Sequence, residues 1–423
     1  MLFTVLPPLL QSQSTDFTDW VSLITLCLAP LIAHLAAGAP QPSYLTPVSP
    51  RWHDRLCHYI PTSIMWRYAA ITDRRIRSFG WDIQTIAAAN ALFWTPRGWD
   101  GSEQMAACSL EYCTYLPETA RVEMLSWDMA KTLITTLQGV QAIYDLGGNP
   151  SLNGPMRVAV NTIFSPLAIL GLYRLSAALW LTTHFNFAPR SQVLALGFTR
   201  RLSLDSLLEE PEKPPTPVHY YRATSYLPSR VFRSIFSLPM LILWLLLLFH
   251  TFGSPITSTQ SFSFLICNIL YHLILAPSLV IIGYYFARGM TTTTIIPCIS
   301  ATWYKIYSVT VMGLMLGLIA VSSVETRKTP CGTWTATSGF NGDYWTCKSR
   351  TSEFIRVDPG LGGNAFGIAS TYSNTTAGSM LEAGQFWVDN FTGSCIGTWS
   401  SQRRVRGTIL DTVQAEGLVW PSP

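Results

Sequence analysis

Three long stretches of this chain contain no charged residue, and this feature constrains the fold more than any other. No Asp, Glu, Lys or Arg occurs between Asp19 and Arg51, between Arg233 and Arg288, or between Lys305 and Glu325. A soluble domain keeps its surface solvated with charges, and 12% of this chain is charged, about half the usual globular share. The uncharged stretches therefore indicate segments that cross a lipid bilayer.

Four apolar runs are long enough to cross a membrane. A bilayer core of about 30 Å requires roughly 20 apolar residues in a helix. The predicted spans are Trp20–Ala37, Ile235–Phe252, Phe262–Ala287 and Ile306–Val324. The second and third flank the short link GSPITSTQS and predict a helical hairpin. The first is interpreted as a retained helix and not as a cleaved signal peptide, because no Lys or Arg precedes it.

The segment Val158–Phe185 is a fifth candidate span with two interpretations. It is apolar, but Arg174 lies in its middle, and an arginine at the centre of a membrane helix costs about 3 kcal/mol on insertion scales. The segment either crosses the bilayer or forms a re-entrant or interfacial hairpin bent at Pro166.

The positions of the arginines predict which side of the membrane each region faces. Arg230 and Arg233 precede the hairpin and Arg288 follows it. Positive residues stay cytosolic, so the tail after the last span faces the lumen or the outside. If Val158–Phe185 spans, the N-terminus is cytosolic and residues 41–156 are lumenal. If it does not, the N-terminus is lumenal and residues 41–233 are one cytosolic region.

The apolar and polar segments divide the chain into seven parts. These are an N-terminal tail with the first span (1–40), a helical extramembrane region (41–155), the fifth candidate span (156–185), a Pro-containing loop (186–234), the hairpin (235–287), a loop with the last span (288–325) and the tail (326–423). The sequence thus predicts an all-α membrane protein with four or five transmembrane helices, a helical membrane-proximal region and a small β-rich C-terminal extramembrane domain.

The membrane-proximal region is expected to form a small helical bundle on the membrane surface. Apolar residues recur at helical spacing in Arg67–Phe93 and Ala120–Leu146. The connector TPRGWDGSEQ between them is rich in turn formers. In the second helix, one apolar face consists of Leu133, Leu137, Val140 and Tyr144.

The tail has the features of an external domain. Asn374 and Asn390 each begin an Asn-x-Thr glycosylation sequon. Cys331, Cys347 and Cys395 could supply one disulfide between two of the three, and spacing does not choose the pair. Short polar and aromatic runs broken by Gly favour β-strands.

Few polar residues lie inside the predicted spans. Asn268 and His272 are one helical turn apart in the third span, and together with Arg174 they form a candidate intramembrane polar site. Gly313 and Gly317 have the GxxxG spacing that lets another helix approach closely. They predict either packing within the chain or a homo-oligomer through the last span.

No motif indicates a catalytic, cofactor-binding or metal site. The sequence contains no GxSxG, HExxH or dinucleotide fingerprint. His53, Cys57 and His58 have no second ligand cluster, so packing is the favoured interpretation of these residues. The net charge of +4 is too small to predict nucleic-acid binding.

Three runs carry a resemblance to a known group of proteins. WDIQTIAAANALFW (Trp81–Trp94), RGWDGSEQM (Arg97–Met105) and TLQGVQAIYDL (Thr136–Leu146), followed by the apolar hairpin, resemble uncharacterised multi-pass membrane proteins of filamentous ascomycete fungi. The resemblance covers most of the chain and implies a fungal membrane protein. It implies no catalytic or binding residue.

These observations support two hypotheses about function. The first is a non-enzymatic membrane anchor, sensor or scaffold of the secretory pathway, whose glycosylated tail meets the outside. Its partners would be the lipid bilayer and other proteins. The alternative is a small-solute channel or carrier built around Arg174, Asn268 and His272.

Overall fold

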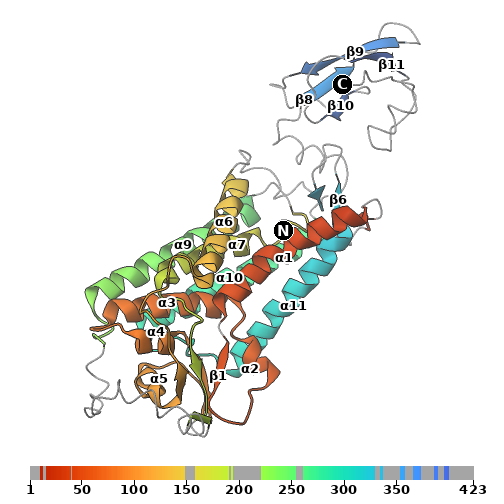
Figure 1. Ribbon diagram of the computed structural model, residues 1–423. Coiled ribbons are helices and arrows are strands. Elements are labelled where there is room, and N and C mark those ends of the chain that lie inside the picture. The colour runs from red at the N-terminus through yellow and green to blue at the C-terminus, as the bar shows by residue number, and fades with distance from the viewer. Residues whose placement is uncertain are drawn as a thin grey trace.

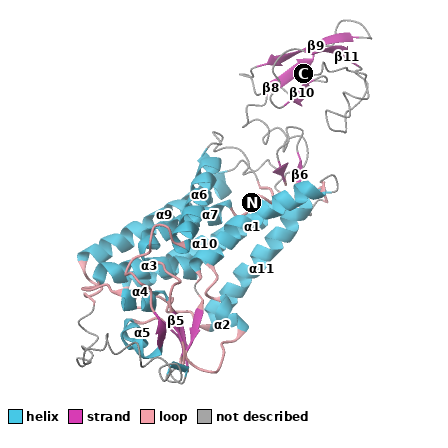
Figure 2. Cartoon of the chain, viewed as in Figure 1, coloured by secondary structure: helices cyan, strands magenta, loops and turns pink. Residues whose placement is uncertain are grey.

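The computed structural model describes residues 10–12, 16–39, 41–147, 158–189, 192–193, 221–253, 261–328 and 334–336, and the backbone of four strands between residues 353 and 399. The described chain is mostly helical (Figure 2). Four helices are long and apolar enough to cross a membrane, which confirms the four predicted spans. They are α1 (Phe17–Gly38), α9 (Leu227–Gly253), α10 (Phe262–Ala287) and α11 (Thr302–Glu325).

One end of this helix bundle, called here the tail end, holds the start of α1 and the end of α11. Asp19 and Lys328 form an ion pair of 3.2 Å, and Gln11 N donates to the carbonyl oxygen of Val324. The N-terminal segment and the chain leaving α11 thus lie on one side. This arrangement fits an even number of crossings and not the five-span interpretation.

Glu325 joins α10 and α11 at the tail end. Its buried carboxylate accepts hydrogen bonds from Ser263 N (2.8 Å), Ser263 Oγ (2.6 Å) and Phe262 N (3.2 Å). The first amides of a helix have no partner within the helix and carry partial positive charge. A carboxylate placed there stabilises the start of α10 and fixes the end of α11 against it.

The opposite end of the bundle carries a small mixed unit, called here the cap (Figure 1). Its helices are α2 (Trp52–Leu56), α4 (Ile83–Asn90), α5 (Glu103–Cys108) and a 3-10 turn at Ser109–Tyr112. Its main sheet has the order β1 (Pro42–Tyr44), β2 (Leu92–Thr95), β3 (Gly98–Asp100), with β1 parallel to β2 and β2 antiparallel to β3. A second pair joins β4 (Cys113–Tyr115) to β5 (Asn186–Phe187).

This sheet corrects the prediction of one helix over Arg67–Phe93. The first helix, α3 (Pro61–Arg77), ends before Gly80. A new helix, α4, then starts where Asp82 accepts a hydrogen bond from Thr85 N. The residues predicted as a connector form a hairpin instead, since Gly98 adopts a φ of 107° that a side chain disfavours.

Helix α3 lies across the cap ends of the spanning helices. At its start, Thr62 Oγ1 shares hydrogen bonds with Ser278 of α10 (2.7 Å) and Tyr307 of α11 (2.8 Å). At its end it reaches the first turn of α9. Every residue of α3 except Arg75 and Ile76 is buried, so α3 is the centre of the fold.

The segment Val158–Phe185 is not a continuous helix. It contains the short helix α7 (Ser165–Gly171), with Pro166 in its first turn, and the 3-10 helix η3 (Leu172–Trp180). Both pack on α6 (Trp127–Gly147) and α7 also packs on α1. A Cβ on Gly139 of α6 would lie 2.9 Å from the carbonyl oxygen of Ala168, so α6 and α7 are in close contact.

The apolar face of the second membrane-proximal helix points away from the rest of the described chain. Its apolar face, Leu133, Leu137, Val140 and Tyr144, is 55–76% exposed. The face that packs inward carries Asp128, Thr132, Thr135 and Ala142.

The tail contributes short strands. β6 (Arg327–Lys328) pairs with β7 (Trp334–Thr335). β8 (Glu353–Val357), β9 (Ala365–Tyr372), β10 (Gln385–Val388) and β11 (Cys395–Trp399) pair antiparallel in the order β10-β8-β9-β11. Asn374, Asn390, Cys331 and Cys347 lie outside the described residues, as does the side chain of Cys395. The glycosylated, disulfide-bonded β domain therefore stays a prediction.

Candidate functional site

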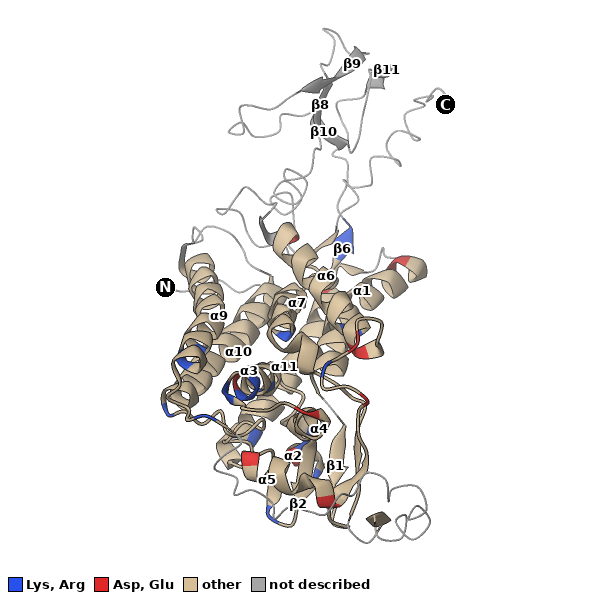
Figure 3. Cartoon of the chain, turned by 60° about the vertical axis from the view of Figure 1, so that its left-hand side comes forward, with Lys and Arg blue, Asp and Glu red and all other residues tan. Residues whose placement is uncertain are grey.

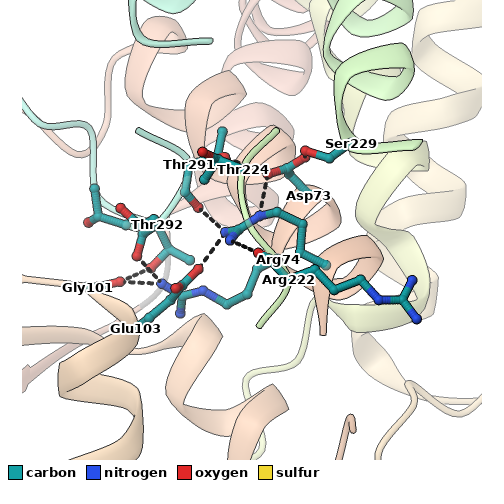
Figure 4. Close-up of polar contacts among 12 residues, drawn as sticks. Asp73, Arg74, Gly101, Glu103, Arg222, Thr224, Ser229, Thr291 and Thr292 are labelled. Atoms are coloured by element: carbon teal, nitrogen blue, oxygen red, sulfur yellow. Dashed lines mark hydrogen bonds and ion pairs between the residues drawn. The ribbon is translucent and has the colours of Figure 1, made fainter. Parts of the chain in front are cut away.

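A cluster of buried charges lies where α3, α5, the start of α9 and the segment after α10 meet (Figure 4). Its charged members are Asp73, Arg74, Arg77, Glu103 and Arg233. Figure 3 shows charged residues gathered on α3, whereas the spanning helices carry few between their ends. The cluster is therefore the main concentration of buried charge in the described bundle, and it is the candidate functional site.

Asp73 is the hub of this cluster. Its carboxylate is completely buried and accepts a hydrogen bond from Arg77 Nε at 3.0 Å. It also accepts from the hydroxyl of Ser229 in α9 and from that of Thr291 after α10. Arg233 Nε lies 3.9 Å away. One carboxylate thus joins three segments that are far apart in the sequence.

Arg77 is equally well connected. Its Nη2 donates to Glu103 of α5 and to the carbonyl oxygen of Thr291 (3.2 Å). Its Nη1 donates to the carbonyl oxygen of Arg222 (3.1 Å), and Arg222 N donates back to the carbonyl oxygen of Arg77 (2.7 Å). The guanidinium, 1% exposed, therefore has donors satisfied on each of its three nitrogens.

Arg74 is less completely satisfied. Its Nη2 donates to the carbonyl oxygens of Gly101 (2.7 Å) and Thr292 (2.9 Å). Within the described residues, its Nε and Nη1 have no hydrogen-bond partner, and its guanidinium lies 5.9 Å from the ring centroid of Tyr221. Burial lowers the pKa of Arg74, and the charge of Arg77 adds to this effect.

A backbone bridge fixes the segment after α10 to the cap. Ser102 pairs with Thr293 as an antiparallel bridge. Glu103 N donates to the carbonyl oxygen of Thr292 (3.0 Å), and Thr294 N donates to that of Gly101 (3.1 Å). Gly101 permits this approach, because a Cβ there would lie 2.7 Å from Thr294 Oγ1.

The geometry favours a structural junction over acid–base chemistry. The Asp73 carboxylate is engaged by hydrogen bonds from Arg77, Ser229 and Thr291 of the same chain. Removing one partner of such a buried pair leaves an uncompensated charge, which is strongly destabilising. The cluster can thus hold the cap, α9 and the α10–α11 connection in one arrangement.

A second group of buried polar atoms lies beside α3. His58 and Arg67 line a small cavity of about 10 Å³ with Gly38, Ser63 and Leu92. In the described structure, His58 Nε2 and Arg67 Nε have no hydrogen-bond partner. Burial, together with the charge of Arg67, lowers the pKa of His58 to about 3, and the charge of Asp54 partly opposes this shift. His58 is therefore neutral at physiological pH.

Arg174, nominated from the sequence, is buried and anchored within the chain. Its Nε donates to Thr132 Oγ1 (2.7 Å) and its Nη2 to the carbonyl oxygen of Asp128 (3.0 Å). Its Nη1 donates to the carbonyl oxygen of Ala37 near the end of α1. The side chain links η3 to α6 and α1.

Asn268 and His272 form contacts of a different kind. Asn268 Oδ1 accepts a long hydrogen bond of 3.4 Å from Thr251 of α9, so the pair links the two helices of the hairpin. His272 Nδ1 lies 3.1 Å from the carbonyl oxygen of Asn268. The described contacts do not bring these two residues together with Arg174.

Gly313 and Gly317 lie on an open face of α11. A Cβ at either position would meet nothing within 4 Å in the described structure. The neighbouring Leu316 is 64% exposed. The described residues therefore leave the GxxxG face accessible to another helix.

Sequence reasoning missed the Asp73 cluster. The Asp73 and Arg77 spacing of one helical turn was visible in the run TDRRIR, and it permits an ion pair on a helix surface. The partners Ser229 and Thr291 follow 156 and 218 residues later, so the local pattern could not place them.

Comparison with known proteins gives this site no counterpart. The chain matches no family model, no curated protein and no solved structure.

Proposed function

We propose that this chain is a non-enzymatic membrane anchor, sensor or scaffold of the secretory pathway. Its four apolar helices hold it in the bilayer. Its tail, with sequons at Asn374 and Asn390, faces the outside, and its cap faces the cytosol. The resemblance to fungal membrane proteins is compatible with this role and assigns it no chemistry.

One observation supports this function most directly. The central charges of the Asp73 cluster are occupied by other segments of the same chain, as Asp73 and Arg77 illustrate. Catalytic and transport sites keep polar groups available for a substrate. The main donors and acceptors of this cluster instead hold four segments of the chain together. They support a rigid platform that displays the cap and the tail on opposite sides of the membrane.

Removal of the tail tests this role. A chain lacking residues 329–423 keeps the Asp73 cluster and should still resist carbonate extraction from membranes. It should lose any larger complex that the full-length chain forms on native gels of mildly solubilised membranes. If the truncated chain keeps that complex and its cellular activity, the tail is not the functional element and the proposal fails.

The alternative of a small-solute channel or carrier has a distinct test. Asn268 and Thr251 place a polar contact between α9 and α10 inside the hairpin, the one observation that favours it. Purified protein in sealed vesicles should show no flux of small ions or neutral solutes if the scaffold function is right. Flux that disappears in the Asn268→Leu variant, with folding intact, would establish the alternative.

The open face of α11 is proposed to mediate self-association. Gly313 and Gly317 lie along this face, and close helix contact through small residues is a common basis for helix dimers in membranes. A dimer would double the number of tails displayed on one assembly.

A further inference from the structure

Helix α6 has its polarity reversed relative to a helix of a soluble domain. Its inward face is formed by Asp128, Thr132, Thr135, Gly139 and Ala142. Its outward face carries the large apolar side chains Leu133, Ile134, Leu137, Val140, Ile143 and Tyr144, each between 47% and 76% exposed. Helices at a water-facing surface bury their apolar stripe, so water does not fit this face.

The inward face is satisfied by contacts within the chain. Asp128 accepts hydrogen bonds from Thr183 N (2.7 Å) and Lys131 Nζ (2.8 Å). Thr132 accepts from Arg174 Nε (2.7 Å). The polar groups that would oppose entry into lipid thus have hydrogen-bond partners in α6 itself, in η3 and in the segment that follows η3.

Contacts at its two ends show how far the segment that packs on α6 extends along the helix bundle. At one end, Arg174 reaches the carbonyl oxygen of Ala37, where α1 approaches the cap. At the other, Val160 N donates to Thr326 Oγ1 (2.9 Å), and Ala336 N donates to the carbonyl oxygen of Val158 (2.7 Å). Thr326 directly follows α11. The segment from Val158 to Arg174 therefore runs from the tail end to the cap end.

Helix α6 is long enough to run the same distance in the opposite direction. It has 21 residues, and at 1.5 Å per residue a helix of that length extends about 31 Å, close to the thickness of a bilayer core. Trp127 lies at its first residue and is 68% exposed, as expected for an interfacial tryptophan. Its exposed polar residues Gln141 and Asp145 fall in the last two turns, near the other interface.

From this geometry we infer that α6 and the segment 158–180 are a membrane-embedded hairpin, and that the outward face of α6 contacts lipid acyl chains. The face resembles the surfaces of α1 and α9, where Ile32 is 58% and Leu246 is 48% exposed on helices apolar enough to span. Six crossings result, and they agree with the shared position of Asp19 and Lys328. Lipid is the occupant that matches a stripe of five aliphatic side chains and Tyr144 with no charged residue among them.

Photo-crosslinking tests this assignment without altering the native cysteines. The photoreactive residue p-benzoylphenylalanine is introduced singly at position 137, at position 246 of α9 as the lipid-facing control, and at position 110 of the cap as the water-facing control. Leu137, Leu246 and Leu110 are all exposed in the described structure, at 60%, 48% and 56%. The purified chains are reconstituted in phosphatidylcholine vesicles, irradiated and analysed by mass spectrometry.

The expected result is a phospholipid adduct at position 137 in a yield similar to that at position 246 and several-fold above that at position 110. A yield at 137 as low as at 110 would place α6 in water and overturn the inference. Crosslinked protein dimers in place of lipid adducts at 137 would also overturn it, since a second copy would then cover the face. Correct reconstitution is checked by the adduct at position 246.

Discussion

Arg77 and Asp73 stand one turn apart on α3, with Nε of the arginine 3.0 Å from Oδ2 of the aspartate and both side chains shielded from solvent. Each also contacts segments from other parts of the chain. The pair is therefore a tertiary contact, although its spacing is that of an ordinary surface ion pair.

Replacement of Asp73 by Ala should destabilise the fold by about 3–5 kcal/mol, because the buried Arg77 loses one of its two carboxylate partners and the hydroxyls of Ser229 and Thr291 lose their acceptor. The thermal unfolding midpoint in detergent measures the effect. Glu118→Ala, on an exposed side chain of the cap, is the matched control and should leave the midpoint unchanged. The double variant Asp73→Ala with Arg77→Met should recover part of the loss. Equal midpoints for Asp73→Ala and the control would show that the cluster does not hold the fold.

His58 should make stability depend on pH on the acidic side of neutrality. Its pKa is about 3 in the folded chain, against 6.5 in the unfolded chain. Above pH 6.5 the residue is neutral in both states. Between pH 6.5 and 3 the unfolded state binds the proton, so stability falls as the pH falls. Unfolding midpoints measured from pH 7.5 to 5 should decline, and His58→Phe should flatten this decline. An unchanged slope in the variant would assign the pH dependence to other groups.

Arg174→Lys should destabilise the chain even though the charge is kept. The guanidinium reaches three acceptors on α6 and α1, and a lysine ammonium cannot reproduce its planar fork. Each hydrogen bond lost from a charged donor costs about 1.5–3 kcal/mol. Arg121→Lys, at an exposed position, controls for the substitution itself. Detergent-solubilised samples are compared by thermal unfolding. Full stability of Arg174→Lys would mean that its charge alone matters.

Gly313→Leu and Gly317→Leu should abolish self-association and spare the monomer, since a side chain at either position enters open space. Light scattering of the solubilised protein reports the mass of the assembly, and thermal unfolding reports stability. Gly139→Leu is the contrasting variant: its Cβ would lie 2.6 Å from Leu172 Cγ, so this change should lower stability. A monomeric wild-type protein would remove the basis for the α11 interface.

Asp100→Asn creates the sequon Asn-Gly-Ser in the cap and tests sidedness. The asparagine can still accept the 2.9 Å hydrogen bond from Ser102 N, so the hairpin should be retained. The tail should show a glycosidase-sensitive mobility shift that depends on Asn374 and Asn390, and Asp100→Asn should add none. An added shift would place the cap in the lumen and reverse the proposed orientation.

The sequence predicted the spanning helices because an uncharged apolar run has one stable solution in a bilayer. It did not predict the hairpin at Gly98, whose strands of three and four residues are too short to show an alternating pattern. For α6, the spacing of Leu133, Leu137 and Val140 revealed an apolar face and gave its period correctly. Periodicity does not say whether such a face meets protein or lipid, so the sequence left open what the face contacts.

The candidate site was beyond the sequence for a related reason. Arg174 was found because an isolated charge in an apolar segment is conspicuous. Asp73 lies in the charged run TDRRIR, where a solvated surface is the ordinary expectation. Only the placement of Ser229 and Thr291 around it, by packing of distant segments, turns that run into the centre of the molecule.

The hydroxyls of Ser229 and Thr291 share one carboxylate; Ser229 lies in the first turn of α9, and Thr291 lies in the segment that follows α10. A tilt of α9 against α10 changes the separation of these hydroxyls and so strains their common hub. Glu103, whose side chain is 20% exposed, continues this chain of contacts to the solvent through Arg77. The cap and the membrane hairpin are thereby joined through one continuous set of polar contacts, from Glu103 through Arg77 and Asp73 to Ser229 and Thr291.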